Sequence, residues 1–328
     1  MSHRPIVFAT TLCLWAAASC TRLNPASQDA GTGGASLPDS STDHAEVSGN
    51  GGMRGAGGAG VGGAGVGGAG TGGAGMAGAG MGGAGVGGAG GSSAAAGCAL
   101  IMHMDEVSWN GSSGEVIDSC HHNNGTAVRV VSAADALPNT TNGGKYGGRA
   151  GMFIDSGGCV EVSDDSSLHA TTQLTVADWI FPTGFNPLSN GIVGKRADYL
   201  SDSSYTLFVW NNLDVNYHLY ADIGNDRFNG SQTLNANFWY HVALVFDGTL
   251  PAAQRVRLYV NGSLDGEFNE TATSVPVFQT PVHVGCMPAG TPPSAGQEFI
   301  GKLDEVAIWT RALGAAELMQ LALSTTPL

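Results

Sequence analysis

The stretch FWYHVALVFDG, residues 238–248, decides the fold of this chain. Its side chains alternate with a period of two, and both alternating sets are apolar or aromatic apart from His241. A segment of this length and pattern is typical of a β-strand that packs against other elements on both sides. We therefore expect this strand to be buried on both faces, or nearly so.

A second strand follows after a short loop, in QRVRLYVNGSLDGEF at residues 254–268. Its apolar residues alternate with longer ones, Val256, Leu258 and Val260 against Arg255, Arg257 and Tyr259. This pattern predicts a half-buried strand. The dipeptide Asn261-Gly262 then offers two residues that tolerate positive φ, as a type I′ hairpin turn requires. The two stretches together predict an antiparallel meander.

These residues also carry a family resemblance. The run W-x-H-V-A-x-x-F-D-G, followed by V-x-L-Y-V-N-G, resembles the core of the laminin G-like jelly roll in the concanavalin A-like lectin/glucanase superfamily. Phe299–Trp309, followed by Arg311, Ala312 and Leu313, resembles the closing strand of that family. The resemblance covers about residues 98–323. It implies a two-sheet antiparallel β-sandwich in which the first and last strands pair.

The composition divides the chain into three parts. Residues 1–20 resemble a signal peptide, residues 21–97 are of low complexity, and residues 98–328 form the predicted globular domain. From Val61 a pentad such as VGGAG recurs, and its Gly and Ala residues offer no side chains that could form a core. We expect a disordered, flexible tether that carries one β-sandwich and ends in a short amphipathic helix at residues 315–323.

The amino-terminal segment predicts export. An apolar run from Ile6 to Ala18 follows His3 and Arg4 and is too short to span a membrane. Its end, Ala-Ala-Ser-Cys, resembles a bacterial lipobox, which implies lipidation of Cys20 and anchoring at the outer membrane or cell surface. The alternative is an ordinary signal peptide cut near Ala18, which would release the protein by secretion.

The net charge limits the classes of binding partner, and the number of cysteines indicates the cellular compartment. The formal net charge of −14 argues against binding to nucleic acid, and against a membrane contact other than the lipid anchor. Four of the six cysteines fall in the globular part, which predicts two disulfides in an exported protein. We favour the pairs Cys98–Cys120 and Cys159–Cys286, although four cysteines allow three pairings.

Catalysis is not expected. Glycosidases of the resembled superfamily need two carboxylates flanking one bond, and the E-x-D-x-x-E and E-x-D-x-E spacings do not occur in this chain. Asp304 and Glu305 are adjacent, so on a regular strand their side chains would face opposite sides. The sequence also has no G-x-S-x-G, H-E-x-x-H or phosphate-loop motif.

Calcium is the one cofactor that the sequence suggests. Asp118 lies in a polar turn, and Asp304 lies where the closing strand should meet the first strand. The resemblance implies that calcium is bound in some members, and carboxylate oxygens suit that ion. The alternative is that each carboxylate caps its own turn by accepting backbone N–H bonds.

Aromatic residues around two predicted strands suggest a ligand site. They are Tyr199, Tyr205, Trp210, Tyr217 and Tyr220. The alternation of Trp210 with its neighbours predicts that it belongs to the core. Tyr199, in a loop with Asp198 and Asp202, is the candidate for an exposed ligand contact.

The sequence thus predicts a non-catalytic, surface-tethered module that binds a glycan or an extracellular protein through loops at the rim of the sandwich. The alternative is a structural or adhesive component of the cell envelope without a small-ligand site. A concave groove lined by aromatic side chains would favour binding over scaffolding.

Overall fold

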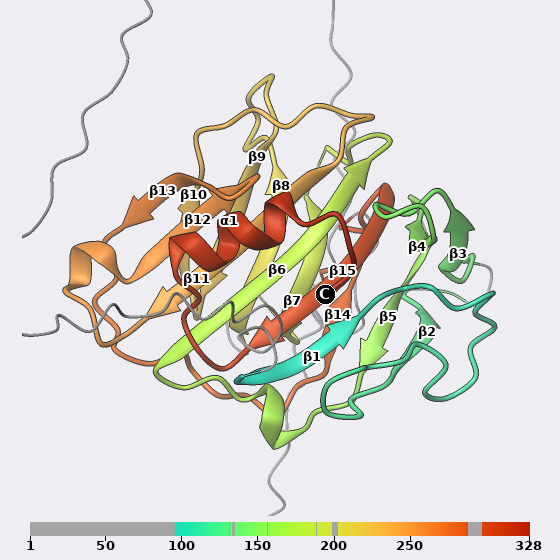
Figure 1. The fold of residues 1–328 in the computed structure, drawn as a ribbon, viewed down its shortest axis with the longest axis horizontal. Coiled ribbons are helices and arrows are strands. Elements are labelled where there is room, and N and C mark those ends of the chain that lie inside the picture. The colour runs from blue at the N-terminus through green and yellow to red at the C-terminus, as the bar shows by residue number, and fades with distance from the viewer. Residues whose placement is uncertain are drawn as a thin grey trace, which may run out of the picture. The chain divides into compact units, whose positions relative to one another are not determined.

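The computed structural model describes residues 96–130, 132, 135–155, 157–187, 189–198, 203–287 and 297–328. The signal peptide, Cys20 and the tether up to residue 95 lie outside the described residues, and so do Tyr199 and Asp202. Within the described part, strands form two antiparallel sheets that enclose one main core (Figure 1). The predicted all-β, two-sheet antiparallel sandwich is therefore confirmed.

The first sheet has eight strands. In spatial order they are β13 (Ser263–Phe268), β12 (Val256–Val260), β11 (Tyr240–Asp247), β6 (Gln173–Pro182), β15 (Gly301–Trp309), β4 (Arg149–Phe153) and β3 (Asn139–Asn142), with β1 (Cys98–Met102) paired to β15. Residues 301–303 of β15 pair with β4, and residues 306–309 pair with β1. The expected pairing of the first and last strands is present.

The second sheet has seven strands. In spatial order they are β10 (Asp226–Asn229), β9 (His218–Ile223), β8 (Ser203–Trp210), β7 (Asn190–Arg196), β14 (Val282–Val284), β5 (Gly158–Val162) and β2 (Gly125–Arg129). The structure also describes two short 3₁₀ segments, Ser166–Leu168 and Ala252–Gln254, and one α-helix, α1 (Ala315–Leu323). No helix among the described residues is long and apolar enough to cross a membrane.

Strand β11 occupies the position that its sequence predicts. All eight of its residues are buried, and it pairs with β6 on one side and β12 on the other. Val242, Leu244 and Phe246 belong to the main core, whereas Ala243 and Val245 belong to a second cluster on the outer face. The apolar residues on both faces of this strand are therefore explained by burial on both sides.

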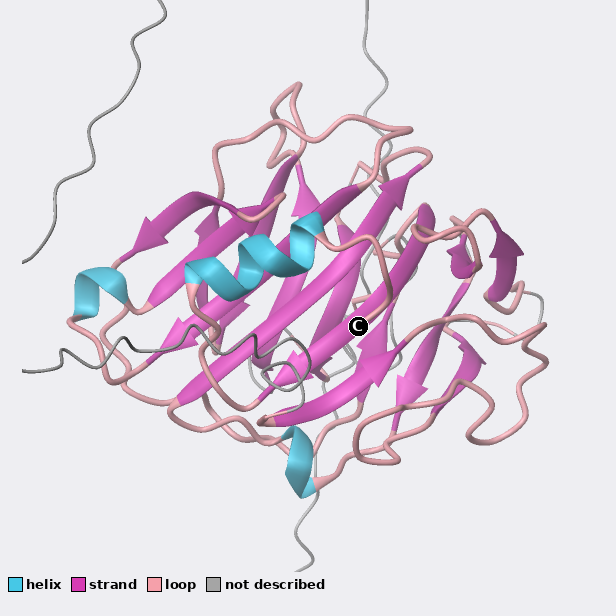
Figure 2. Cartoon of the chain, viewed as in Figure 1, coloured by secondary structure: helices cyan, strands magenta, loops and turns pink. Residues whose placement is uncertain are grey.

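Helix α1 covers part of the outer face of the eight-stranded sheet (Figures 1 and 2). Its Leu318 is fully buried in the cluster that contains Ala243, Val245 and Tyr259. Tyr259 is only 3% exposed for this reason, so β12 is more deeply buried than its alternation predicted. The helix has the bounds that the sequence pattern predicts.

The hairpin between β12 and β13 has the predicted turn. Asn261 and Gly262 have φ angles of 51° and 76°, and Val260 pairs with Ser263 across them. The Asn261 side chain also accepts a hydrogen bond from the backbone N–H of His241 on β11, at 3.0 Å. The turn thereby fixes the register of β12 and β13 and ties the hairpin to the neighbouring strand.

Both favoured disulfides are present in the structure. One joins Cys98 on β1 to Cys120, and the other joins Cys159 on β5 to Cys286, two residues beyond β14. Each connects segments that are already close in the fold, with Cα–Cα distances of 6.2 and 5.5 Å. Disulfides persist in oxidising compartments, which agrees with an exported protein.

The central position of β11 makes a quantitative prediction. Leu244→Ala should lower the free energy of unfolding by about 2–5 kcal/mol, because it opens a cavity in the main core. Leu264→Ala is the matched control, since Leu264 on β13 is 53% exposed and its truncation should change stability by less than about 0.5 kcal/mol. Urea denaturation of the full chain measures both, and equal losses would contradict the assignment of β11 to the core.

Candidate functional site

The outer face of the seven-stranded sheet carries a second set of aromatic side chains. On β8 and β9, Leu207, Val209, Leu219 and Ala221 face the main core. The residues between them face the other way, and Phe208, Trp210, Tyr220 and Met287 form a separate cluster. Strand register places Tyr220 opposite Phe208 and His218 opposite Trp210. The period of two thus separates a core face from an outer face that is also aromatic.

The three rings pack against one another through Tyr220. Its ring centroid lies 5.5 Å from that of Phe208 and 5.5 Å from that of Trp210, with interplanar angles of 30° and 60°. These are favourable tilted and edge-on geometries for aromatic pairs. Trp210 is half-buried, so part of its ring remains accessible to a ligand.

Charged side chains border the rings. Arg227 on β10 makes two hydrogen bonds to the carboxylate of Asp222 on β9, with donor–acceptor distances of 2.7 and 2.9 Å. The Arg227 guanidinium also lies over Phe208 and Trp210, at 5.1 and 5.3 Å from their ring centroids. Bidentate pairing and cation–π contact together fix the orientation of this guanidinium.

A second arginine reaches the same carboxylate from β7. Arg196 donates from Nη1 to Asp222 at 3.5 Å, and from Nη2 to the Gln297 side chain at 3.1 Å. Its side chain is only 1% exposed, whereas that of Arg227 is 38% exposed. Arg196 is therefore buried beneath the site, and Arg227 is partly exposed at its surface.

These groups surround a cavity of about 380 Å³, which we call the aromatic cavity. Its lining residues are Pro187, Ser189, Arg196, Phe208, Trp210, Leu213, Arg227, Met287 and Gln297. The volume lies within the usual range for small-molecule sites, which are mostly apolar with a few placed polar groups. The side chains come from β7, β8 and β10 and from the loops before β7, after β8, after β14 and before β15.

The location of Trp210 corrects the sequence analysis. We expected it in the core because Tyr205–Trp210 alternates with apolar residues on both faces. The structure places Tyr205, Leu207 and Val209 in the core, and Phe208 and Trp210 on the outer face. Because both sets are hydrophobic, alternation alone could not identify which face pointed inward.

The sequence predicted Asp198, Tyr199 and Asp202 as the ligand contacts. Asp198 follows β7 and is half-buried, whereas Tyr199 and Asp202 lie outside the described residues. Their role stays a prediction. None of the residues that line the aromatic cavity was a predicted contact, although Trp210 was among the aromatics considered.

Asp118, the first calcium candidate, has its oxygens engaged. Oδ1 accepts hydrogen bonds from the backbone N–H groups of Ile101 and Cys120, at 2.8 and 2.9 Å. Oδ2 accepts from those of His121 and Asn123, at 2.9 and 2.8 Å. Four donors use about all the lone-pair positions of a carboxylate. Asp118 therefore does not fit a calcium ligand, and its geometry favours the turn-capping alternative.

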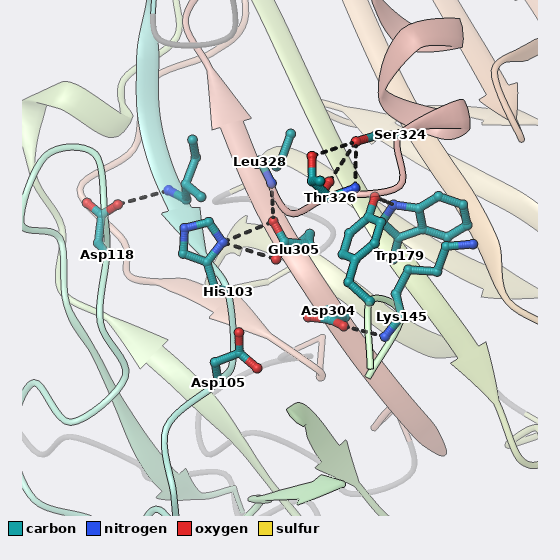
Figure 3. A network of polar contacts seen from close by, with 12 residues as sticks. His103, Asp105, Asp118, Lys145, Trp179, Asp304, Glu305, Ser324, Thr326 and Leu328 are labelled. Carbon is teal, nitrogen blue, oxygen red and sulfur yellow. Dashed lines mark hydrogen bonds and ion pairs between the residues drawn. The ribbon is translucent and has the colours of Figure 1, made fainter. Parts of the chain in front are cut away.

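Asp304, the second calcium candidate, lies on the outer face of the other sheet. It accepts a hydrogen bond from the backbone N–H of Lys145 at 2.7 Å (Figure 3). Burial, together with the nearby charges of Glu305 and Asp105, raises the pKa of Asp304 to about 7. Among the described residues, no group of three or more His, Cys, Asp or Glu side chains is arranged to hold a metal ion.

Glu305 has partners of its own. Both of its carboxylate oxygens lie 3.0 Å from Nδ1 of His103, and Oε2 accepts the backbone N–H of Leu328 at 2.8 Å (Figure 3). A β-bulge shifts the register between Asp304 and Ala307, and Glu305 has a φ of 56°. The expectation that Asp304 and Glu305 face opposite sides rested on regular alternation, which this bulge interrupts.

The loop that reaches Asp304 is held by a second set of contacts. Lys145 lies with Nζ 3.6 Å from the ring centroid of Trp179, and the Trp179 indole N–H donates to the Tyr146 hydroxyl at 3.0 Å. Burial raises the pKa of Asp178, the neighbour of Trp179 on β6, well above its ordinary value. The contacts of Lys145 and Tyr146 connect the 143–148 loop to β6 and β15 and stabilise its position.

Comparisons with known proteins agree with the architecture. A family model described as "Concanavalin A-like lectin/glucanases superfamily" matches residues 155–319. Among curated proteins none matches. Domain 4 of the extracellular arabinanase AbnA from Geobacillus stearothermophilus, solved with arabinotriose, is 18% identical over 69% of this chain and 98% of its own, with a TM-score of 0.50. This likeness shows the fold.

Two further solved structures are less similar. A heptameric pentraxin from Limulus polyphemus is 21% identical over 47% of this chain and 71% of its own, with a TM-score of 0.38. A putative carbohydrate binding protein from Bacteroides ovatus is 18% identical over 56% of this chain and 54% of its own, with a TM-score of 0.42.

The assignment of Asp118 to turn capping predicts a stability effect. Asp118→Ala should lower the free energy of unfolding by about 3 kcal/mol, because one buried and three partly buried N–H groups lose their shared acceptor. Thermal unfolding of the full chain, with and without a calcium chelator, measures it. Wild-type stability should not depend on the chelator. A chelator effect in the wild type that disappears in Asp118→Ala would restore the calcium interpretation.

The raised pKa of Asp304 predicts a pH effect of definite sign. Between about pH 4 and 7 the folded chain holds a proton that the unfolded chain releases, so stability should fall as pH rises through this window. Asp304→Asn keeps an acceptor for Lys145 and removes the titration, so its stability should fall less steeply than that of the wild type.

Comparing the pH dependence of stability of the wild type with that of Asp304→Asn separates the contribution of Asp304 from those of two histidines. The pKa of His103 is raised, chiefly by its hydrogen bond to Glu305, and its stabilisation is lost as pH rises through that pKa. The pKa of His241 is lowered to about 4 by burial, so its contribution is lost as pH falls from 6.5 toward 4. Both remain in the variant. Identical pH dependence of the two proteins would contradict the prediction.

Proposed function

The chain belongs to the concanavalin A-like lectin/glucanase superfamily, and on that premise we propose that its globular domain is a non-catalytic module that binds carbohydrate in the aromatic cavity. The observation that carries this proposal is the joint presence of Trp210, Phe208 and Tyr220 with two arginines and a carboxylate on one sheet face.

A sugar ring matches these groups chemically. Its C–H faces are apolar and weakly positive, so they pack on the electron-rich faces of aromatic rings. Its hydroxyl groups both donate and accept, so they can pair with guanidinium N–H groups and with amide or carboxylate oxygens. Trp210 would supply the stacking surface, and Arg227 and Gln297 would supply the polar contacts.

The charged residues support binding rather than hydrolysis. Hydrolysis of a glycosidic bond by the usual route needs two carboxyl groups on either side of that bond. The described residues that line the aromatic cavity include no Asp or Glu. Asp222, which lies beside them, is held by the guanidinium groups of Arg196 and Arg227, which restrict its movement.

This proposal moves the binding site from the rim loops to the sheet face, with loop residues such as Leu213 and Met287 at its border. Presentation at a cell surface through a lipid on Cys20 stays a prediction, since that residue lies outside the described part of the chain. A structural role in the cell envelope is the rival function, and no described feature specifically favours it over binding.

The proposal is tested by screening the full chain on an array of polysaccharides and oligosaccharides. Arabinotriose is included because the arabinanase domain of similar fold was solved with it. Trp210→Ala should weaken binding at least about tenfold, because aromatic stacking adds roughly 1 kcal/mol to the loss of buried apolar area.

Trp239→Ala is the matched control for this experiment. Trp239 is also half-buried, but it packs on Phe181 of the eight-stranded sheet, with ring centroids 5.3 Å apart. It should leave affinity unchanged. Failure of every saccharide to bind, or equal losses in the two variants, would contradict the proposed site and favour the structural alternative.

A further inference from the structure

A second hollow adjoins the aromatic cavity, and we call it the polar recess. Its volume is about 450 Å³. Its lining residues are Asn211, Asn212, Asp214, His218, Tyr220, Asn229, Gly230 and Ser231. Apart from Tyr220 and Gly230, these side chains are all polar, in contrast to the apolar and aromatic residues that dominate the first cavity.

Strand register places the two hollows side by side. Arg227 and Asn229 lie two residues apart on β10, so they share a face, and they pair with Asp222 and Tyr220 of β9. Tyr220 in turn pairs with Phe208 of β8. Arg227 and Phe208 line the aromatic cavity, whereas Asn229 and Tyr220 line the polar recess. The hollows are thus neighbouring positions on one sheet face, with Tyr220 between them.

The polar recess offers groups that suit hydroxyls. Local bonds fix two of its residues through one side-chain atom each, since Asp214 Oδ1 accepts the Val215 N–H at 2.6 Å and His218 Nδ1 contacts the Gln232 carbonyl at 3.1 Å. Their second polar atoms, Oδ2 and Nε2, have no hydrogen bond to any described residue. An oriented side chain with a remaining donor or acceptor is what a hydroxyl-rich ligand requires.

The charged groups in and beside the two hollows balance. Arg196 and Arg227 line the aromatic cavity and both pair with Asp222, which lies beside it, and Asp214 lines the polar recess. The two arginines and the two aspartates have formal charges that sum to zero. The chain as a whole has a formal net charge of −14, which repels polyanions. The electrostatics therefore favour a neutral ligand over an acidic one.

We propose that the aromatic cavity and the polar recess are consecutive subsites for one neutral oligosaccharide of at least two sugar residues. One sugar ring stacks on Trp210 in the aromatic cavity. The next residue of the same chain places its hydroxyls against Asp214, His218 and Asn229 in the recess. This inference rests on the proposed function and adds the charge and minimum length of the ligand.

The experiment measures affinity as a function of chain length. Arabinose and arabino-oligosaccharides of two to four residues, and glucose with cello-oligosaccharides of the same lengths, are titrated into the full chain by calorimetry. Galacturonic acid trimer is the anionic probe. In the series that binds, affinity should rise about tenfold or more beyond the monosaccharide, because the added residue gains new hydrogen bonds. The anionic trimer should bind more weakly than the neutral trimer.

Variants assign this gain to the recess. The double variant Asp214→Ala/Asn229→Ala should remove the dependence on chain length and leave monosaccharide affinity within about twofold, whereas Trp210→Ala should weaken every ligand. Asn235→Ala is the control, since Asn235 is exposed and lines neither hollow.

The outcomes separate the two proposals. Affinity that is equal for all chain lengths, tighter binding of the anionic trimer, or a double variant that weakens the monosaccharide as much as the trimer would overturn the two-subsite inference and leave carbohydrate binding intact. Failure of Trp210→Ala to weaken any saccharide that binds would overturn the proposed site and the inference with it.

Discussion

The structure depends on strands that are hydrophobic on both faces. In a two-sheet sandwich one face of each sheet fills the core, and an apolar outer face then needs another partner. On the eight-stranded sheet that partner is part of the chain itself, because Leu318 of α1 covers Ala243, Val245 and Tyr259. On the seven-stranded sheet the corresponding residues border hollows, since Phe208 and Trp210 line the aromatic cavity and Tyr220 lines the polar recess. This difference between the two outer faces is the physical basis of the proposed function.

Acidic residues have a different task on the eight-stranded sheet. Asp118 gathers backbone N–H groups from β1 and from the turn that carries Cys120. Asp304 accepts a backbone hydrogen bond from the 143–148 loop, and Glu305 accepts one from Leu328, beyond α1. The bulge at Glu305 directs its side chain toward His103. A negatively charged sequence thus uses several carboxylates as acceptors for its own backbone. Burial raises the pKa of one of them, Asp304, to about 7, so this carboxylate links the stability of the fold to pH.

The sequence predicted the central elements well, because strong local signals agreed with one another. The residues of β11, the Asn261-Gly262 turn and the closing strand each have a pattern that only one element satisfies. The bounds of α1 followed from its period of 3.6 residues. The two disulfides required a choice among three pairings. The favoured pairing, in which Cys98–Cys120 staples the first strand to its following loop, is the one in the structure.

The site was harder to predict, for two physical reasons. The outward direction of Trp210 depends on which face of β8 packs into the main core, and both faces of β8 carry hydrophobic residues. The association of Arg196, Asp222 and Arg227 depends on the order of β7, β8, β9 and β10 in the sheet. These residues are up to 31 positions apart in the sequence, and no local pattern connects them.

The most direct test of the central claim follows the indole N–H signals of the six tryptophans by NMR during titration with a saccharide. Arabinotriose is the first ligand to try, followed by the neutral saccharide that binds most tightly on the array. We predict that the Trp210 signal shifts, while those of Trp109 and Trp309, which are 2% and 0% exposed, and of Trp239 stay in place. A shift at Trp239 with none at Trp210, or no shift with any saccharide that binds, would contradict the account.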